Sequence, residues 1–118
     1  MTNTTLASKP SLFVAGSEAA FPLPDSPSVV VAPLLRSDDG HQADVFFLTI
    51  PAGCSVPREL HPFSETLVPV SGVLACSVDD AEPVIVQPGT VIHIPADAPH
   101  VVKSVGDEPA VATMIIGV

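Results

Sequence analysis

Three observations on the sequence predict an all-β protein built as a jelly-roll barrel. Valine is frequent and the chain contains 14 prolines, a combination that favours strands separated by turns over helices. Short apolar segments recur along the chain, and residues typical of turns separate them at near-regular intervals. No segment shows a convincing helical pattern. Many short strands with regular turns are typical of double-sheet barrels and sandwiches.

The domain organisation follows from length and from the placement of proline. A chain of 118 residues with 47% hydrophobic residues can bury the core of one domain. We expect residues 28–118 to form this single β-barrel domain. We expect residues 1–27 to form a proline-rich arm, with Phe21 to Pro27 as part of the arm or as an edge covering, because this segment contains too many prolines for a helix or a central strand. A strand at 11–15 is an option within this arm.

The strands of the barrel are predicted from the apolar segments in order. The first two, at 29–35 and 44–50, are joined by Ser37 to Gly40, whose Asp-Gly step favours a tight turn. The next strand carries Glu59 and His61. The remaining strands are expected at 65–70, 72–78, 84–87, 90–94, 100–105 and 110–116.

Potential metal ligands are concentrated in the middle of the chain. Glu59 and His61 are two residues apart, so on an extended strand both side chains would point to the same face. Pro62 has no backbone donor, which predicts that the chain leaves the strand between His61 and Glu65. His100 comes from a later strand. Two imidazoles and a carboxylate suit Fe(II), and the same donors also bind Mn, Zn, Ni or Co, so the ligands leave the metal open.

The spacing of these residues resembles the first sequence motif of the cupin family. That motif reads Gly, five residues, His-x-His, three or four residues, Glu, six residues, Gly. Gly53, His61, Glu65 and Gly72 match it, and Glu59 occupies the position of the first histidine.

A second cupin motif reads Gly, five residues, Pro-x-Gly, two residues, His, three residues, Asn. Gly89, Pro95 and His100 match it, whereas Asp97 replaces the inner glycine and Ser104 the terminal asparagine. On this resemblance we identify the chain as a small single-domain cupin. The resemblance implies a cupin-type double-stranded β-helix and formation of a homodimer.

The resemblance is compatible with an enzyme and with a non-catalytic binding protein, and the fold alone does not distinguish the two. Our first hypothesis is a dioxygenase-like oxidoreductase that uses a divalent transition metal (Fe, Mn, Zn or Ni) and acts on a small oxygen-rich organic substrate. A metal-dependent isomerase, decarboxylase or lyase is a further alternative. A non-catalytic binding or sensor protein is favoured by the departures at Glu59, Asp97 and Ser104, and by the scarcity of aromatic and basic residues that usually clamp a substrate.

Glu59 has two functional interpretations. It is either a fourth metal ligand beside His61, Glu65 and His100, or a catalytic general base next to a 2-His-1-carboxylate triad. The non-functional alternatives are that Glu59 is a surface carboxylate beside Arg58 and that His61 and His100 are ordinary core histidines.

Other polar residues are weaker candidates. His93 is a secondary candidate for the site, because hydrogen bonding behind the ligands or ordinary packing would explain it as well. Arg58 and Lys103 alternate with the motif residues on their strands, which predicts that both point outward. Cys54 and Cys76 are expected to stay reduced, because the sequence shows no signal peptide.

The charge and hydropathy of the chain exclude some partners. Its formal net charge is −9, from 4 basic and 13 acidic side chains, so phosphate backbones and anionic membranes would be repelled. No apolar segment approaches the length needed to span a membrane. We therefore expect a cytoplasmic protein that binds a small molecule, with neither nucleic acid nor a membrane as a partner.

Overall fold

A computed structural model describes residues 10, 12–14, 20–40 and 43–117. Within these residues the chain forms ten strands and no α-helix. One turn of 3-10 helix, η2 (Ser37–Asp39), ends at Gly40 in the left-handed conformation, where the Asp-Gly turn was predicted. The strands are β1 (Phe21–Leu23), β2 (Ser26–Leu35), β3 (Asp44–Ile50), β4 (Ser55–Glu59), β5 (Glu65–Ser71), β6 (Leu74–Val78), β7 (Val84–Val86), β8 (Ile92–Ile94), β9 (His100–Ser104) and β10 (Ala110–Ile116).

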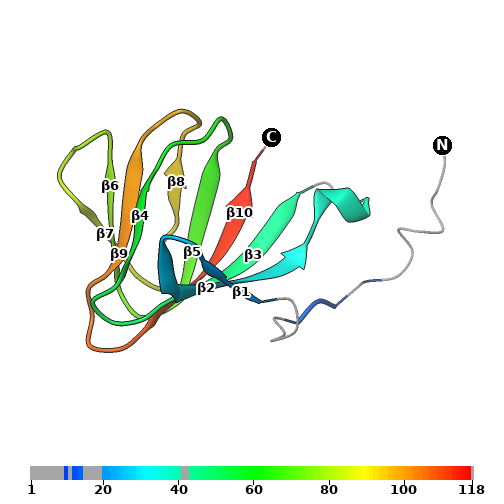
Figure 1. The fold of residues 1–118 in the computed structure, drawn as a ribbon, viewed down its shortest axis with the longest axis horizontal. Helices are drawn as coiled ribbons and strands as arrows, with labels where there is room; N and C mark the ends of the chain where they lie inside the picture. The colour runs from blue at the N-terminus through cyan, green and yellow to red at the C-terminus, as the bar shows by residue number, and fades with distance from the viewer. Residues whose placement is uncertain (1–9, 11, 15–19, 41–42, 118) are drawn as a thin grey trace.

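The strands form two antiparallel sheets that face each other (Figure 1). The larger sheet has the order β1-β2-β3-β10-β5-β8, and the smaller sheet has the order β4-β9-β6-β7. Strands distant in sequence are therefore neighbours, as where β10 lies between β3 and β5. The all-β, two-sheet jelly-roll prediction is confirmed.

The core lies between the sheets and is built from every second residue of the strands. On β3, Leu48 and Ile50 are buried, and on β6, Leu74 and Cys76 are buried. This alternation is what a sheet with one buried face requires. It also means that polar residues at inward positions must lie within the barrel.

Part of the N-terminal region forms an edge strand. Residues 21–27, assigned to the arm, include β1 and the start of β2, and Phe21 pairs with Val31. β1 is the edge strand of the larger sheet, where a proline such as Pro22 is tolerated. The strand considered at 11–15 is absent from residues 12–14, which have no regular structure, while residues 11 and 15 lie outside the described residues.

Several predicted strands are shorter than expected, among them those at 72–78, 84–87 and 100–105, which are observed as Leu74–Val78, Val84–Val86 and His100–Ser104. The strand expected at 90–94 contains only Ile92–Ile94, and the strand predicted to carry both Glu59 and His61 ends at Glu59. Among the residues that the structure describes, no helix is long and apolar enough to cross a membrane.

Candidate metal centre

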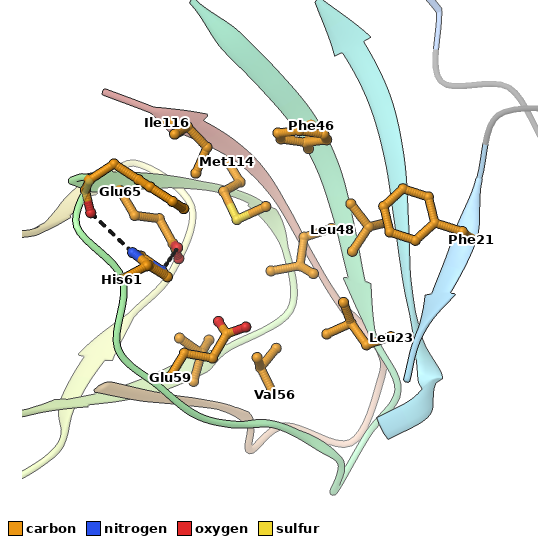
Figure 2. Close-up of a pocket in the computed structure, with 13 residues that line it drawn as sticks. Phe21, Leu23, Phe46, Leu48, Val56, Glu59, His61, Glu65, Met114 and Ile116 are labelled. Atoms are coloured by element: carbon orange, nitrogen blue, oxygen red, sulfur yellow. Dashed lines mark hydrogen bonds and ion pairs between the residues drawn. The ribbon is translucent and has the colours of Figure 1, made fainter. Parts of the chain in front are cut away.

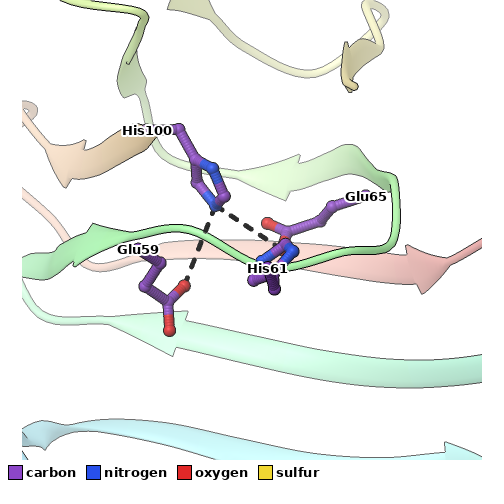
Figure 3. Close-up of side chains that lie close together, drawn as sticks. All are labelled: Glu59, His61, Glu65 and His100. Atoms are coloured by element: carbon purple, nitrogen blue, oxygen red, sulfur yellow. Dashed lines mark ion pairs between the residues drawn. The ribbon is translucent and has the colours of Figure 1, made fainter. Parts of the chain in front are cut away.

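Four potential ligands lie together, as Figure 3 shows: Glu59, His61, Glu65 and His100. One donor atom of each side chain lies within 4.8 Å of the others. Glu59 ends β4 and His100 begins β9 of the smaller sheet, whereas Glu65 begins β5 of the larger sheet. The structure therefore brings together all four residues that the sequence singled out, and the cluster connects the two sheets.

The convergence has a different origin from the expected strand alternation. Glu59 pairs with His100 across the β4–β9 ladder, which places the two side chains side by side. His61 lies beyond the end of β4, in a loop. Its backbone carbonyl accepts a hydrogen bond of 2.9 Å from the backbone N–H of Asp97. The loop is thus attached to the turn that precedes His100.

Both imidazole rings are oriented by backbone carbonyls. The Nδ1 atom of His61 lies 3.0 Å from the carbonyl oxygen of Phe63, and the Nδ1 atom of His100 lies 2.9 Å from that of Ala98. A carbonyl oxygen can only accept a hydrogen bond, so each Nδ1 must donate. In the neutral rings the lone pairs are then on Nε2, which faces the cluster. This arrangement is common for histidines that bind metals.

The centre of the cluster contains acceptors but no matching donors. His61 Nε2 lies 3.2 Å from Glu65 Oε1. His100 Nε2 is buried without a hydrogen-bond partner among the described residues, at 3.8 Å from Glu65 Oε1 and 3.9 Å from Glu59 Oε1. Lone pairs and carboxylate oxygens that face one another are stabilised by a proton or by a cation between them. The four side chains therefore fit a divalent transition metal.

The two carboxylates differ in their surroundings. Glu65 is only 4% exposed, and burial raises its pKa, although nearby His100 and His61 oppose that shift. The side chain of Glu59 is 41% exposed. Glu65 is thus the carboxylate that most needs a positive partner, and Glu59 is the one that solvent reaches.

Phe63 packs directly on His61. The two rings are stacked, with centroids 4.1 Å apart and an interplanar angle of 5°. His100 meets the same imidazole edge-on, with centroids 4.9 Å apart. Since Phe63 also provides the carbonyl that holds Nδ1, one residue restrains His61 through both its main chain and its side chain.

A cavity of about 210 Å³ lies beside the cluster, between the sheets. Glu59, His61 and Glu65 form one side of it, as Figure 2 shows. The rest of its wall is apolar and comes mainly from β1, β2, β3 and β10: Phe21, Leu23, Val31, Phe46, Leu48, Val56, Phe63, Val102, Met114 and Ile116.

These wall residues were not singled out from the sequence. The available signal was apolar residues two apart, as at Phe46 and Leu48 or at Met114 and Ile116, which places them on one face of a strand. Phe21 and Leu23 show the same spacing, but we assigned both to the arm because prolines surround them.

A family comparison agrees with this geometry. Residues 46–116 match the model of the cupin domain. The chain belongs to the cupin family. A search of curated proteins finds no match to this cupin.

Solved cupin structures resemble the chain over most of its length. A predicted oxalate decarboxylase from Thermotoga maritima has a TM-score of 0.74 at 19% identity, covering 89% of this chain and 98% of the other. A cupin domain of an XRE family transcriptional regulator from Enterobacter cloacae gives 0.68 at 22% identity, covering 77% and 97%. A polyketide cyclase from Streptomyces resistomycificus gives 0.70 at 18% identity, covering 80% and 68%. At these identities the similarity shows the fold alone.

The departures from the cupin motifs have different structural consequences. Asp97, at the position of the inner glycine, has a left-handed φ of 60°, a conformation that glycine favours and that aspartate tolerates better than most residues. Ser104 is fully buried, and its backbone N–H donates to the carbonyl of Cys54 at 2.9 Å. Its Oγ has no hydrogen-bond partner among the described residues, and nothing in the structure explains the serine there.

The remaining candidates lie outside the cluster. The exposed His93 interacts with Thr66 through Nδ1, at 3.1 Å from Oγ1. Arg58 and Lys103 are exposed, as predicted, and Arg58 forms an ion pair of 2.6 Å with Asp80.

The two cysteines are free thiols, as expected. Burial raises the pKa of Cys76 to about 11, so this thiol is unreactive at neutral pH.

Proposed function

We propose that this cupin is a metal-dependent enzyme that acts on a small organic molecule in the cavity between its sheets. The observation that carries the proposal is the convergence of Glu59, His61, Glu65 and His100, the first three of which line one side of the cavity. Two of these side chains present Nε2 lone pairs to the cluster. In a purely structural core such a set would lower the stability of the fold, because buried hydrogen-bond acceptors without donors are destabilising.

In the proposed site His61, Glu65 and His100 hold the ion. Together they form a 2-His-1-carboxylate set, which suits Fe(II) and also accepts Mn, Zn or Ni. A metal held there would act as a Lewis acid on a substrate oxygen, and iron would add redox chemistry with O₂. The stacked Phe63 and the two backbone carbonyls keep the imidazoles in a binding orientation.

Glu59 is the residue we propose as general base. It lines the cavity, and it also borders a smaller cavity of about 90 Å³ together with Asp25 and Arg58. Because its side chain is 41% exposed, it can accept a proton from a substrate in the larger cavity and release that proton to solvent. Its distance of 3.9 Å from His100 Nε2 also keeps the role of fourth ligand open.

We propose a dioxygenase-like reaction as the finer assignment. In such a reaction both atoms of O₂ enter the organic substrate, so the substrate supplies all the electrons and no other reductant is needed. The donor set supports this assignment through its suitability for Fe(II). The same base and ion could instead serve an isomerase, a decarboxylase or a lyase, in which Glu59 would move a proton and O₂ would not be consumed.

A non-catalytic sensor is the second candidate. It is favoured by the wall of the cavity, which is apolar apart from Glu59, His61 and Glu65 and so offers few groups to activate or clamp a substrate. A cupin domain of a transcriptional regulator is among the similar structures.

The first test is the metal content of protein purified without chelator and without nickel resin. We expect near-stoichiometric metal in the wild type and its loss in His61→Ala and His100→Ala. His93→Ala is the matched control, because this exposed histidine lies outside the cluster. Wild-type protein that takes up no Fe, Mn, Zn or Ni would contradict the proposal.

Turnover separates the enzyme from the sensor. Fe(II)-loaded protein is supplied with a panel of small hydroxyketones while O₂ uptake and products are followed. We expect uptake that Glu59→Gln abolishes with metal retained. Loss of metal in Glu59→Gln would identify a ligand rather than a base. A compound that raises the melting temperature without being consumed would favour the sensor.

A further inference from the structure

The cavity limits the chemistry of the molecule that it accepts. We infer that this ligand is uncharged, with a hydrocarbon body about the size of one substituted ring and an oxygen-bearing end that meets the glutamates and histidines. The oxygen-bearing end rests on the proposed function of the cluster, whereas the uncharged hydrocarbon body rests on the residues of the cavity wall. It revises the oxygen-rich substrate that we expected from the family resemblance.

The wall opposite the cluster is formed by hydrocarbon side chains. Phe21 and Leu23 of β1 and Phe46 and Leu48 of β3 lie across the cavity from Glu59, His61 and Glu65 (Figure 2). Met114 and Ile116 of β10 line it as well. A hydroxyl, carboxylate or phosphate placed against this wall would lose water without gaining a hydrogen bond. The ligand must therefore be polar at one end only.

No described arginine or lysine lines the cavity. Arg58 and Lys103 are exposed, and Arg58 is paired with Asp80. The guanidinium of Arg36 lies 5.2 Å from the centroid of the Phe46 ring but pairs with Asp44 at 3.3 Å. An anionic ligand would thus find no side-chain cation to replace its lost hydration.

The charge of the cluster also favours an uncharged ligand. Glu59 and Glu65 already carry two carboxylates, which together match the charge of one divalent cation. An added dicarboxylate would give this partly buried site an excess of negative charge. Hydroxyl and carbonyl oxygens bring donor atoms without that penalty.

The volume limits the part of the ligand that lies inside the cavity. An apolar cavity of about 150 Å³ holds benzene in another protein, and the cavity here is about 210 Å³. There is room for one six-membered ring, or a short branched chain, with a few additional atoms.

A matched pair of probes tests the inference. 2-Hydroxyacetophenone and benzoylformate share a phenyl ring and two adjacent oxygens, but only benzoylformate carries a carboxylate. Calorimetric titration of the Zn-loaded protein and of the metal-free protein gives both affinities, with metal content measured on each sample. We expect 2-hydroxyacetophenone to bind at least tenfold more tightly, and oxalate to bind most weakly. Equal or tighter binding of benzoylformate or oxalate would overturn the inference.

A second experiment places a charge in the cavity wall. Phe21→Lys introduces a cation at a cavity residue that is 42% exposed, so the variant is expected to fold. It should shift the preference toward benzoylformate by about tenfold or more, since a new ion pair in a poorly hydrated site is strong. Val84→Lys adds the same charge at an exposed position on β7, away from the cavity, and should leave the preference unchanged.

The two proposals fail in different ways. If the protein binds no metal but retains its preference for the uncharged probe, the proposed enzyme is wrong and the inference stands. If metal binds and the preference is reversed, only the inference is wrong. An unchanged preference in Phe21→Lys would show that the cavity does not select by charge.

Discussion

Three contacts hold His61, two through its imidazole and one through its main chain. Its Nδ1 donates to the carbonyl of Phe63, its ring stacks on the phenyl ring of the same residue, and its own carbonyl accepts from the backbone of Asp97. A loop residue that is held in this way can position a ligand atom as well as a strand residue can.

Glu65 yields a prediction whose sign depends on the metal. Burial raises the pKa of Glu65 above its ordinary value of 4.5, so the folded metal-free protein binds this proton more tightly than the unfolded chain does. The stability of metal-free protein should therefore fall as the pH rises above about 4.5. Glu65→Gln should remove this decline, because glutamine is uncharged and can donate to His61 Nε2. We expect a gain on the order of 1 kcal/mol at neutral pH.

In metal-loaded protein the effect of Glu65→Gln should be reversed. Loss of a carboxylate ligand weakens metal binding and with it the stabilisation that the metal provides. Urea unfolding between pH 4 and 8, with and without chelator, measures both effects. Destabilisation of equal size with and without metal would show that Glu65 is only a structural residue.

At the scale of elements, the register of β4 places Glu59 in the site. β4 is an edge strand, and its pairing with β9 shifts between Val56 and Glu59, an interval that contains Pro57. Such irregularities re-aim the side chains that follow them.

The turn between β5 and β6 gives a second prediction. Gly72 has a φ of 77°, and a Cβ atom there would lie 2.5 Å from the carbonyl oxygen of Pro109. Gly72→Ala should lower the free energy of unfolding by about 3 kcal/mol or more, because both backbones would have to move.

Gly89→Ala is the control for this effect. Gly89 has a similar φ of 96°, but no atom lies within 4 Å of the added Cβ. Gly89→Ala should lower the free energy of unfolding by only about 1 kcal/mol, which is the cost of the left-handed conformation for a residue with a Cβ atom. Urea unfolding of both variants measures the difference, and equal losses would mean that the contact with Pro109 is unimportant.

At the scale of the whole molecule, neither sheet contains a complete site. The smaller sheet carries Glu59 and His100, while the larger sheet carries Glu65 and much of the apolar wall. Ligand binding at the cluster therefore ties the sheets together, and metal removal should loosen their packing as well as the site.

Association of two chains stays a prediction that rests on the family resemblance. The edge strand β1 of the larger sheet, with Phe21 42% exposed, offers an unpaired backbone that another chain could extend. Sedimentation over a wide range of concentration should give a mass of twice the 12.1 kDa of one chain. A mass of one chain throughout would show that the protein is a monomer.

Much of this protein could be predicted from sequence because the relevant information is local. Strand alternation and turn residues determined the elements, as at β3 and at Gly40. The spacing of Glu59, His61, Glu65 and His100 was enough to choose the residues that meet. The prolines of Phe21 to Pro27 argued against a central strand, and β1 is indeed an edge strand, where a residue without an amide donor can join a sheet.

Only the tertiary structure decided how these residues act together. Glu65 is buried while Glu59 is open to solvent because β5 is flanked by β10 and β8 in one sheet, whereas β4 is the edge strand of the other. The apolar cavity forms only where β1, β2, β3 and β10 face the cluster. Local sequence specifies which residues are available, but burial and charge balance depend on chain segments far apart in sequence, which only the packing of the two sheets brings together.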